Sequence, residues 1–370
     1  MKKNSSKKTL INATNLHSGG AVQVATSFIN EMVALEKVDF DVIVSSEIDN
    51  ELRFIKTPVE KFHFYSVINV FGLHTLYNYK FTRLILSYST VFTIFGPLYI
   101  LKKPIKSIVG FAQPWIIYPN NEIYMAYDFF DKLMARFKYF IQKYFYFKSD
   151  KLIVELDHVE EGLNRLVKNT DIIVVNNCIS SIFSDTNKWL PVNYIRADHD
   201  IILLGIVTRD YPHKNLDILP DIAKALRCMY KMNVKFLVSL TNEEWLNRDG
   251  EFHTYVDNVG PINTLQCPLF YNLLDGVIFP SLLECFSATP IEAMMMKKPV
   301  FASDRLFVRQ ACGNFVNYIN PVKPNSIAKI IYKYFLKDTD EKLSFIESAY
   351  IQALKYNNPS KRAIKYIQSI

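Results

Sequence analysis

The chain has 370 residues, which is too long for one ordinary hydrophobic core and suits two domains of about 150 to 200 residues each. A composition that is 49% hydrophobic and 21% charged excludes an intrinsically disordered protein and indicates an ordered, globular one. The formal net charge of +7 favours anionic partners, such as nucleotide diphosphates, acidic lipid headgroups or nucleic acid, without choosing among them.

The N-terminal segment 1–8 is basic, but only a short apolar run follows it, so no signal-peptide core is predicted. The cysteines are scattered along the chain and form no C-x-x-C pair; they are Cys178, Cys228, Cys267, Cys285 and Cys312. This spacing indicates neither a zinc site nor a disulfide framework, and it suits a reducing compartment. We therefore expect a cytoplasmic protein.

The first half of the chain alternates short apolar runs with helical stretches. The apolar runs predict strands at residues 9–14, 40–45, 91–95 and 107–110. After the first strand, a loop containing Gly19 and Gly20 leads into a helix predicted over 21–35, where apolar residues recur at helical spacing. This alternation favours a parallel sheet with helices on both faces, and ligands bind such sheets at the carboxyl ends of the strands.

Two loops follow predicted strands at this edge, at residues 96–97 and 111–115. The second loop contains Gln113 and Trp115, which are our candidates for binding an acceptor substrate. The sequence leaves two interpretations of Trp115 open, because an indole ring stacks on a sugar as well as it packs beneath a loop.

Residues 128–148 are predicted to form a basic, aromatic helix. Its cations are interleaved with Phe and Tyr; they are Lys132, Arg136, Lys138, Lys143 and Lys148. Such a helix lies on an anionic membrane surface or packs on the sheet with its lysines solvated, and the sequence leaves both interpretations open. The apolar region 71–101 is interrupted by polar side chains and by Gly96-Pro97, so no membrane-spanning helix is predicted there.

Strands at 151–154 and 171–175 end the predicted N-terminal domain, and the segment 176–200, which contains Pro191, is expected to connect the domains. The second half repeats the alternation, with strands at 201–207, 234–239, 276–279 and 298–303. We expect an N-terminal domain over 1–185, a C-terminal domain over 186–355, and a last helix within 356–370 that crosses back to the first domain.

Two cations lie in the loop between the strand at 201–207 and a helix predicted from residue 216 to about 230. Arg209 and Lys214 have four residues between them and approach the start of this helix. Cations placed there neutralise a diphosphate, and each charge-assisted hydrogen bond is worth about 1.5 to 3 kcal/mol. They also stabilise a departing nucleotide as negative charge grows on it, so both residues are candidates for catalysis.

Two glutamates flank a predicted strand-to-helix turn. Glu284 lies in the turn after the strand at 276–279, and Glu292 lies on the following helix, predicted over 291–296. The first turn of a helix has unpaired N–H groups and the positive end of the dipole, so it binds phosphate readily. A nucleotide sugar would satisfy both carboxylates, because it carries hydroxyl groups at its two ends and a diphosphate between them.

The motif around these glutamates resembles a known signature. The frame Pro280-Ser281-x-x-Glu284-x-Phe286-x5-Glu292-Ala293-Met294 looks like the E-x7-E motif of retaining glycosyltransferases of family 4. Arg209 and Lys214 match the family's Arg-x4-Lys element, and the loop with Gly19 and Gly20 resembles its opening Gly-Gly loop. The family usually shows Gly-Phe-Gly where this chain has Cys285-Phe286-Ser287.

The resemblance implies the GT-B architecture, an α/β fold of two Rossmann-like domains facing a central cleft. It also implies a role for each matching residue. Glu284 would contact the donor sugar, Glu292 the ribose hydroxyl groups, and the amides of Phe286 and Ser287 the diphosphate. Gly19 and Gly20 would approach the donor phosphates. Many relatives carry a histidine near the acceptor where this chain has Gln113, but front-face attack needs no protein nucleophile.

The same resemblance implies the substrates and the setting. The donor would be a UDP- or GDP-linked sugar, and the acceptor a glycan or a lipid-linked glycan, without a further cofactor. Such an enzyme would act in bacterial surface polysaccharide synthesis, in the cytoplasm and at the inner face of the membrane, where residues 128–148 would contact anionic lipid under the membrane interpretation of that helix.

Two alternatives stay open, a nucleotide-sugar epimerase of the same architecture and a noncatalytic sugar-binding scaffold. A noncatalytic scaffold would not need all four of the charged residues Arg209, Lys214, Glu284 and Glu292, so their presence together favours an enzyme. Asp-x-Asp triplets at 39–41, 198–200 and 338–340 are better explained as turn residues than as ligands of a metal-dependent transferase, so no metal site is predicted. Nucleic-acid binding is not expected, because the basic residues form no continuous tract.

Overall fold

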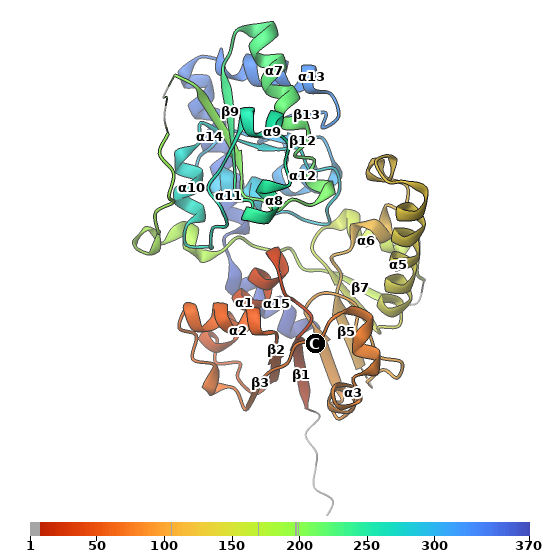
Figure 1. Ribbon diagram of the computed structural model, residues 1–370. Coiled ribbons are helices and arrows are strands. Elements are labelled where there is room, and N and C mark those ends of the chain that lie inside the picture. Colours follow the sequence, from red (N-terminus) through yellow and green to blue (C-terminus); the bar gives the residue numbers. More distant parts are fainter. Residues whose placement is uncertain (1–7, 105, 169, 197, 199) are drawn as a thin grey trace, which may run out of the picture. The chain divides into compact units, whose positions relative to one another are not determined.

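The computed structural model describes residues 8–104, 106–168, 170–196, 198 and 200–370 (Figure 1). They form two compact units. The N-terminal unit contains the described residues up to Asn177 together with Pro359–Ile370, and the C-terminal unit contains those of Cys178–Asn358. Most of the basic segment 1–8 lies outside the described residues.

The N-terminal unit is built on a parallel sheet. Among the described residues its strands are β1 (Thr9–Ala13), β2 (Asp41–Val44), β3 (Phe64–Val67), β4 (Thr90–Thr93), β5 (Lys106–Gly110), β6 (Lys151–Val154) and β7 (Asp171–Val174). Their order across the sheet is β3-β2-β1-β4-β5-β6-β7. This is the order of a Rossmann-like sheet, in which the strand sequence reverses between β1 and β4.

Helices surround this sheet. They are α1 (Gly19–Ala34), α2 (Ser46–Phe54), α3 (Tyr79–Leu86), α4 (Pro114–Ile117), α5 (Phe129–Phe147), α6 (Asp157–Asn164) and α15 (Pro359–Ser369), with 3-10 turns at Val59–Lys61, Gly72–Tyr77 and Glu122–Met125. Consecutive strand residues enter different cores: Ile11 joins the cluster that contains α1, whereas Leu10 joins the cluster of α3. Helices therefore cover both faces, because side chains alternate along a strand.

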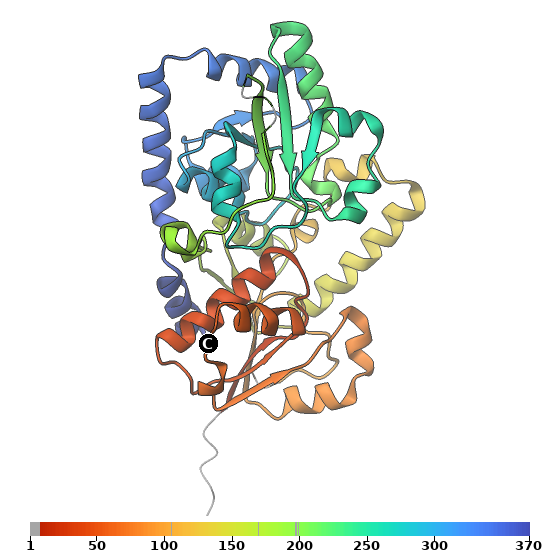
Figure 2. The same ribbon diagram turned by 60° about the vertical axis from the view of Figure 1, so that its left-hand side comes forward.

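The last helix, α15, completes the core of the N-terminal unit. Tyr366 is buried against Phe28 of α1 and Phe92 of β4, with ring centroids 5.2 and 5.5 Å apart. Arg362 is buried beside it and donates to Asn177 Oδ1 at 2.6 Å and to Ser27 Oγ at 2.8 Å. Figures 1 and 2 both show α15, in dark blue, lying along α1.

The C-terminal unit repeats the same plan. Its strands in the described part of the chain are β8 (Ile202–Ile206), β9 (Val234–Val238), β10 (Val256–Asn258), β11 (Gly276–Phe279), β12 (Val300–Ser303) and β13 (Asn317–Ile319). They are parallel and follow the order β10-β9-β8-β11-β12-β13. The reversal of strand order falls between β8 and β11.

The helices of this unit pack in two groups, α7 with α9 and α13, and α11 with α12 and α14. The bounds are α7 (Ile218–Tyr230), α8 (Asn242–Leu246), α9 (Gly250–Tyr255), α10 (Cys267–Leu273), α11 (Thr289–Met295), α12 (Leu306–Cys312), α13 (Pro324–Phe335) and α14 (Thr339–Ala353). Short 3-10 turns lie at Ser181–Ser184, Thr186–Lys188, Pro212–Lys214 and Leu354–Tyr356.

The structure confirms the predicted fold class, two Rossmann-like α/β halves. The edge strands β3 and β13 are not predicted by the sequence, because their side chains are partly exposed and form no continuous apolar run. The observed units meet at Asn177 and Cys178, eight residues before the predicted boundary at 185, and residues 359–370 belong to the N-terminal unit.

Candidate functional site

The sequence-predicted residues of the second half lie around one point of its sheet. Strands β8 and β11 are neighbours, with Leu204 paired to Gly276, although the residues are far apart in the sequence. Their carboxyl ends open into the loops 207–217 and 280–288. Ligands of open α/β sheets bind at this reversal of strand order, because the two loops diverge there and leave room between them.

Lys214 and Glu284 form an ion pair that joins these two loops. The ammonium of Lys214 donates to Glu284 Oε1 at 2.8 Å, and 15% and 11% of the two side chains are exposed. Ser281, which is fully buried, donates its hydroxyl to the same oxygen at 2.8 Å. The sequence predicts both charged residues as site residues but not their contact, which depends on the adjacency of β8 and β11.

The backbone around His213 holds the two loops in register. Its carbonyl oxygen accepts from the amide of Leu282 at 2.8 Å and from the hydroxyl of Ser281 at 3.1 Å. Asn215, with a positive φ of 57°, donates to the carbonyl oxygens of Pro280 and Pro321. Burial lowers the pKa of the His213 imidazole to about 4, outweighing the attraction of Glu284. His213 is therefore neutral at physiological pH.

Arg209 lies in the same loop but has a different partner. Its Nε donates to both carboxylate oxygens of Glu244, at 2.8 and 3.0 Å, and 42% of the side chain is exposed. Glu244 is itself fixed by the capping box of α8, in which Thr241 and Glu244 exchange hydrogen bonds. Glu244 is not among the residues predicted from the sequence, although Thr241-x-x-Glu244 is the signature of a capping box.

Glu292 is held in the first turn of α11. Its Oε2 accepts from the hydroxyl of Tyr271 on α10 at 2.8 Å. Desolvation raises the pKa of Glu292 to about 7, and the Tyr271 bond offsets only part of that rise. No pattern in the sequence identifies Tyr271 as this partner, because helix–helix contacts across a turn leave no local signature.

The segment between the two glutamates contains the remaining candidates. The ring of Phe286 lies against that of Tyr356, with centroids 6.2 Å apart, and both Phe286 and Ser287 are partly exposed. Helix α11 begins at Thr289, two residues before the predicted start, and Ala288 at its N-cap position has no side-chain acceptor for the first N–H groups. Glu284 thus lies in the turn before α11 and Glu292 lies in its first turn, as the sequence predicts.

In the N-terminal unit, Gly19 and Gly20 form the start of α1. Gly19 has a positive φ of 69°, and a Cβ atom at either position would meet no heavy atom within 4 Å. Ser18 at the N-cap makes no side-chain bond, and the first turn of α1 contains no acidic residue. The Cβ directions of Gly19 and Gly20 therefore face open space at the start of α1.

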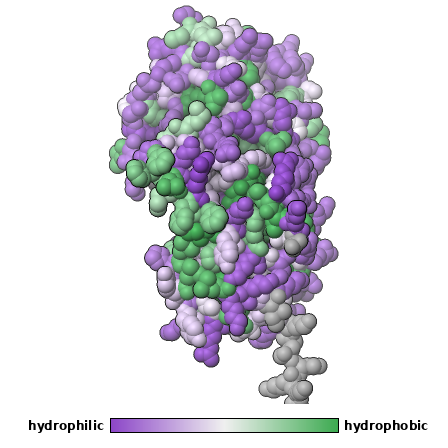
Figure 3. Space-filling view, turned by 90° about the vertical axis from the view of Figure 1, so that its right-hand side faces the viewer, coloured by the Kyte–Doolittle hydropathy of each residue, from purple (hydrophilic) through white to green (hydrophobic). Residues whose placement is uncertain are grey.

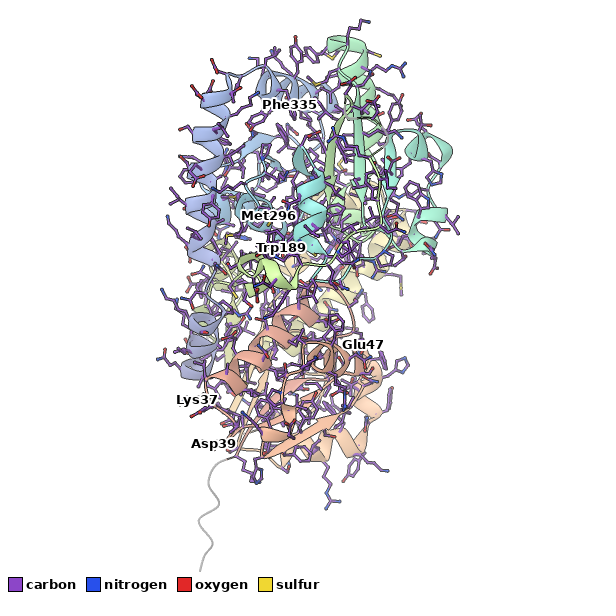
Figure 4. All side chains as sticks on the ribbon, turned by 90° about the vertical axis from the view of Figure 1, so that its left-hand side faces the viewer. Lys37, Asp39, Glu47, Trp189, Met296 and Phe335 are labelled. Carbon is purple, nitrogen blue, oxygen red and sulfur yellow. The ribbon has the colours of Figure 1, made fainter. Side chains whose placement is uncertain are left out.

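His17 fixes this loop and is missed by the sequence-based analysis. Its Nδ1 lies 2.9 Å from Glu47 Oε2, its Nε2 lies 3.0 Å from the carbonyl oxygen of Val70, and its ring stacks on Phe71. Glu47 belongs to α2 and is labelled in Figure 4. His17 thereby ties the ends of β1, β2 and β3 together, although a lone loop histidine gives no such signal in the sequence.

The acceptor-side candidates both contact α5. Gln113 donates through Nε2 to Gln142 Oε1 at 2.9 Å. Trp115 is buried, with its ring stacked on that of Tyr139 at 5.2 Å and 9° and edge-on to Tyr124 at 5.1 Å. This is the packing interpretation of Trp115, and a contact with an acceptor stays a prediction.

The Asp-x-Asp triplets have structural partners or lie at helix starts. Asp41 is buried and accepts from His63 at 2.9 Å and Tyr88 at 2.8 Å. Asp338 and Asp340 stand at the start of α14, and the triplet 198–200 includes a residue outside the described ones. Across the described ranges, no group of three or more His, Cys, Asp or Glu side chains is arranged to hold a metal ion.

Five free cysteines are present, and all except Cys228 are buried. Of the helices in the described ranges, none combines the length and the apolar character needed to cross a bilayer.

One family model matches part of the chain, and many solved structures resemble its fold. Residues 195–352 match the family model described as "Glycosyl transferases group 1". The match falls within the C-terminal unit and includes Arg209, Lys214, Glu284 and Glu292. No curated protein matches the sequence.

Solved structures resemble the whole chain at low sequence identity. Sucrose-phosphate synthase from Thermosynechococcus elongatus has a TM-score of 0.70 at 15% identity, covering 98% of this chain and 97% of the other. A glycosyltransferase from Rickettsia africae scores 0.67 at 15% identity, with 98% of both chains covered. HepE from Anabaena, in complex with UDP-glucose, scores 0.64 at 14% identity, with 98% and 99% covered. The fold is therefore that of the GT-B glycosyltransferases, and residues 195–352 carry the pattern of glycosyl transferases of group 1.

Proposed function

We propose that the protein is a retaining glycosyltransferase that moves a sugar from a nucleotide sugar to a glycan or lipid-linked acceptor. The observation that carries the proposal is the Lys214–Glu284 pair at the reversal of strand order, beside Arg209 and inside the matched segment. A cation for a leaving diphosphate and an anion for a sugar centre stand together there. Bacterial surface polysaccharide synthesis in the cytoplasm is the setting that we propose.

The cations serve the leaving group. As the bond between the anomeric carbon and the phosphate oxygen breaks, negative charge grows on the nucleotide diphosphate. Lys214 has three N–H donors, so it can keep Glu284 and also bind a phosphate oxygen. Glu244 holds Arg209 through its Nε atom. The two terminal guanidinium nitrogens of Arg209 can therefore contact the same diphosphate. Fixed cations at the developing charge accelerate the reaction because they need no reorganisation.

The sugar side needs no protein nucleophile. In front-face attack, the acceptor hydroxyl approaches the anomeric carbon from the side of the departing diphosphate, and its proton passes to the released phosphate oxygen. Positive charge develops on the sugar ring, and the carboxylate of Glu284 would stabilise it. We propose that this step proceeds without a metal ion, since Arg209 and Lys214 supply the positive charge.

The remaining site residues are assigned to binding. We propose that Glu292 contacts the ribose hydroxyls and that the amides of Phe286 and Ser287 contact the diphosphate. Gly19 and Gly20 are assigned to the donor phosphates, and Gln113 and Trp115 to the acceptor. The neighbour HepE was solved with UDP and with UDP-glucose, which makes UDP-sugars the first donors to test, followed by GDP-sugars.

The first experiment measures ligand binding by thermal unfolding with UDP, GDP, ADP and their common sugars, with and without magnesium. A ligand at about 100 times its dissociation constant adds about 2.7 kcal/mol of stability. We expect one nucleotide family to raise the unfolding temperature without magnesium, and the variant Lys214→Gln to reduce that rise. Lys337→Gln, which removes an exposed pair with Glu341, is the matched control. No stabilisation by any of these ligands would contradict the proposal.

The second experiment measures products with the donor so identified. A transferase releases free nucleotide diphosphate and forms a glycosylated acceptor in equal amounts. A nucleotide-sugar epimerase would return an isomeric donor without acceptor product, and a scaffold would bind without releasing diphosphate. The configuration of the new linkage, read by NMR, tests retention, and inversion at the anomeric carbon would overturn that part of the proposal.

A further inference from the structure

The helix α5 presents an apolar stripe to solvent. The stripe consists of large side chains that are each 55–75% exposed: Phe129, Phe130, Leu133, Met134, Phe137, Phe140 and Tyr144. At 3.6 residues per turn these positions fall within an arc of about 140°. Figure 3 views the side of the molecule that carries α5 and shows hydrophobic side chains, in green, gathered there. Soluble proteins seldom leave such a face uncovered.

The opposite side of α5 is the one that packs on the protein. Tyr146 is buried against Phe111, Tyr139 stacks on Trp115, and Gln142 accepts from Gln113. The helix begins where Asp128 caps the amide of Asp131. The helix is therefore anchored by its inner face, and the apolar stripe points away from these contacts.

Cations flank the stripe on both sides. On a helical wheel Lys132, Arg136 and Lys143 fall along one edge and Lys138 along the other. Asp131 is the one acidic residue of α5, in its first turn. An apolar stripe with a row of three cations along one edge and a single lysine at the other is the pattern of a helix that lies in the surface of an anionic bilayer, where each cation adds about 1 kcal/mol.

A hollow of about 340 Å³ lies at the C-terminal end of the stripe and is lined by Phe140, Lys143, Tyr144, Phe147 and Lys148. The ammonium of Lys143 lies over the ring of Phe147 at 5.5 Å, and that of Lys148 lies 5.9 Å from the ring of Tyr144. Burial and the neighbouring Lys103 lower the pKa of Lys148. Next to it, Leu101 is exposed and extends the apolar surface.

We propose that α5 is a peripheral membrane-binding helix whose stripe inserts into the headgroup region of an anionic phospholipid bilayer, with the flanking cations Lys132, Arg136 and Lys143 facing the lipid phosphates. The positive charge along α5 favours an anionic bilayer over a second copy of the chain as the partner of this stripe. A second copy of the chain would place the same cations opposite themselves, and like charges repel across an interface. The negatively charged phosphate groups of anionic lipids can instead pair with these cations. The inference does not depend on the proposed glycosyl transfer.

The test is flotation of the full chain with vesicles of phosphatidylcholine alone or mixed with phosphatidylglycerol. We expect binding to the anionic vesicles, weakened by salt, and none to the neutral ones. Changing Phe137 and Phe140 together to Ser should weaken binding at least about tenfold, because two large apolar side chains no longer leave water. Lys138→Gln with Lys143→Gln, one cation from each edge of the stripe, should weaken it as well. Leu246→Ser, at an equally exposed position of α8, is the control that keeps binding.

A tryptophan introduced into the stripe reports insertion into the bilayer directly, through its fluorescence. With Phe137→Trp, anionic vesicles should shift the added emission to shorter wavelength, whereas Phe54→Trp, on the exposed end of α2, should show no such shift. Equal binding to neutral vesicles, or full binding by the Phe137 and Phe140 variant, would overturn the proposal. So would vesicle-independent dimerisation that the same variant abolishes, because the stripe would then be a contact between copies.

Discussion

At the scale of the residue, the candidate site combines charges that are neutralised within the protein. Lys214 is paired with Glu284 and Arg209 with Glu244 before any ligand is present. Such pairing keeps partly buried charges from destabilising the fold, since removing one partner of a buried pair costs roughly 3 to 5 kcal/mol. Variants at the site must therefore preserve shape, so that a loss of activity is not a loss of folding.

The first prediction concerns Glu284. We expect Glu284→Gln to lower turnover by about 10²-fold or more, because the amide cannot stabilise positive charge at the transferring sugar. Glu347→Gln, which removes an exposed partner of Lys297, should leave turnover unchanged. Turnover is measured as diphosphate release under saturating donor, with thermal unfolding as the check of folding. An active, folded Gln variant would disprove the assigned role.

The second prediction is a pH dependence that Glu292 imposes. The pKa of this carboxyl is about 7 in the folded protein and 4.5 for an ordinary group. Between these values the unfolded chain loses the proton while the folded protein keeps it, so the free energy of unfolding falls as pH rises. This decrease in the free energy of unfolding is at most about 3 kcal/mol. Solvent that reaches part of the Glu292 side chain makes it smaller. Glu292→Gln should remove it in denaturant titrations, whereas the exposed Glu243→Gln should not.

The third prediction is the opposite dependence at His213. Its pKa is about 4 in the folded protein against an ordinary 6.5. As pH falls through this window the unfolded chain takes up a proton that the folded protein does not, so stability is lost with decreasing pH. His213→Gln should flatten this loss, and His74→Gln, on the exposed 3-10 turn Gly72–Tyr77, should not. Parallel curves for variant and wild type would show that His213 is not desolvated.

At the scale of the element, the C-terminal helix α15 is part of a core that it does not adjoin in sequence. Its Tyr366 fills the space between α1 and β4, and its Arg362 is bonded to Ser27 of α1. The periodicity of residues 360–370 predicts a helix. The resemblance to GT-B glycosyltransferases predicts that this helix packs on the N-terminal domain. The partners themselves are decided by the shape of the core, because aromatic rings pack wherever their faces and edges fit.

The fourth prediction follows from this packing. Tyr366→Ala should destabilise the N-terminal unit by about 3 to 5 kcal/mol, because a large buried ring is lost and the core cannot close fully around the cavity. Tyr79→Ala, at a residue that is 78% exposed in the same unit, should have little effect. Calorimetry of both variants measures the difference. A loss below about 1 kcal/mol for Tyr366→Ala would show that α15 is not integral to this core.

At the scale of the whole molecule, each unit has its own sheet and its own core, so each can unfold in its own transition. The fifth prediction uses this separation. A bound nucleotide should raise the midpoint of the C-terminal transition, because the matched segment and its charged loops belong to that unit. Tyr366→Ala should lower only the other transition. Calorimetry with and without nucleotide tests this, and a nucleotide that shifts only the N-terminal transition would contradict the site assignment.

The sequence by itself determined the alternation of strands and helices, the loops that carry charge, and the resemblance to a glycosyltransferase motif. These are local properties, since periodicity and loop chemistry are set by neighbouring residues. The tertiary structure decided that Lys214 meets Glu284 across 70 residues, that Tyr271 holds Glu292, and that the apolar stripe of α5 faces outward. Those contacts depend on which strands lie side by side and which helix face the core accepts, and a single sequence does not encode either in a local pattern.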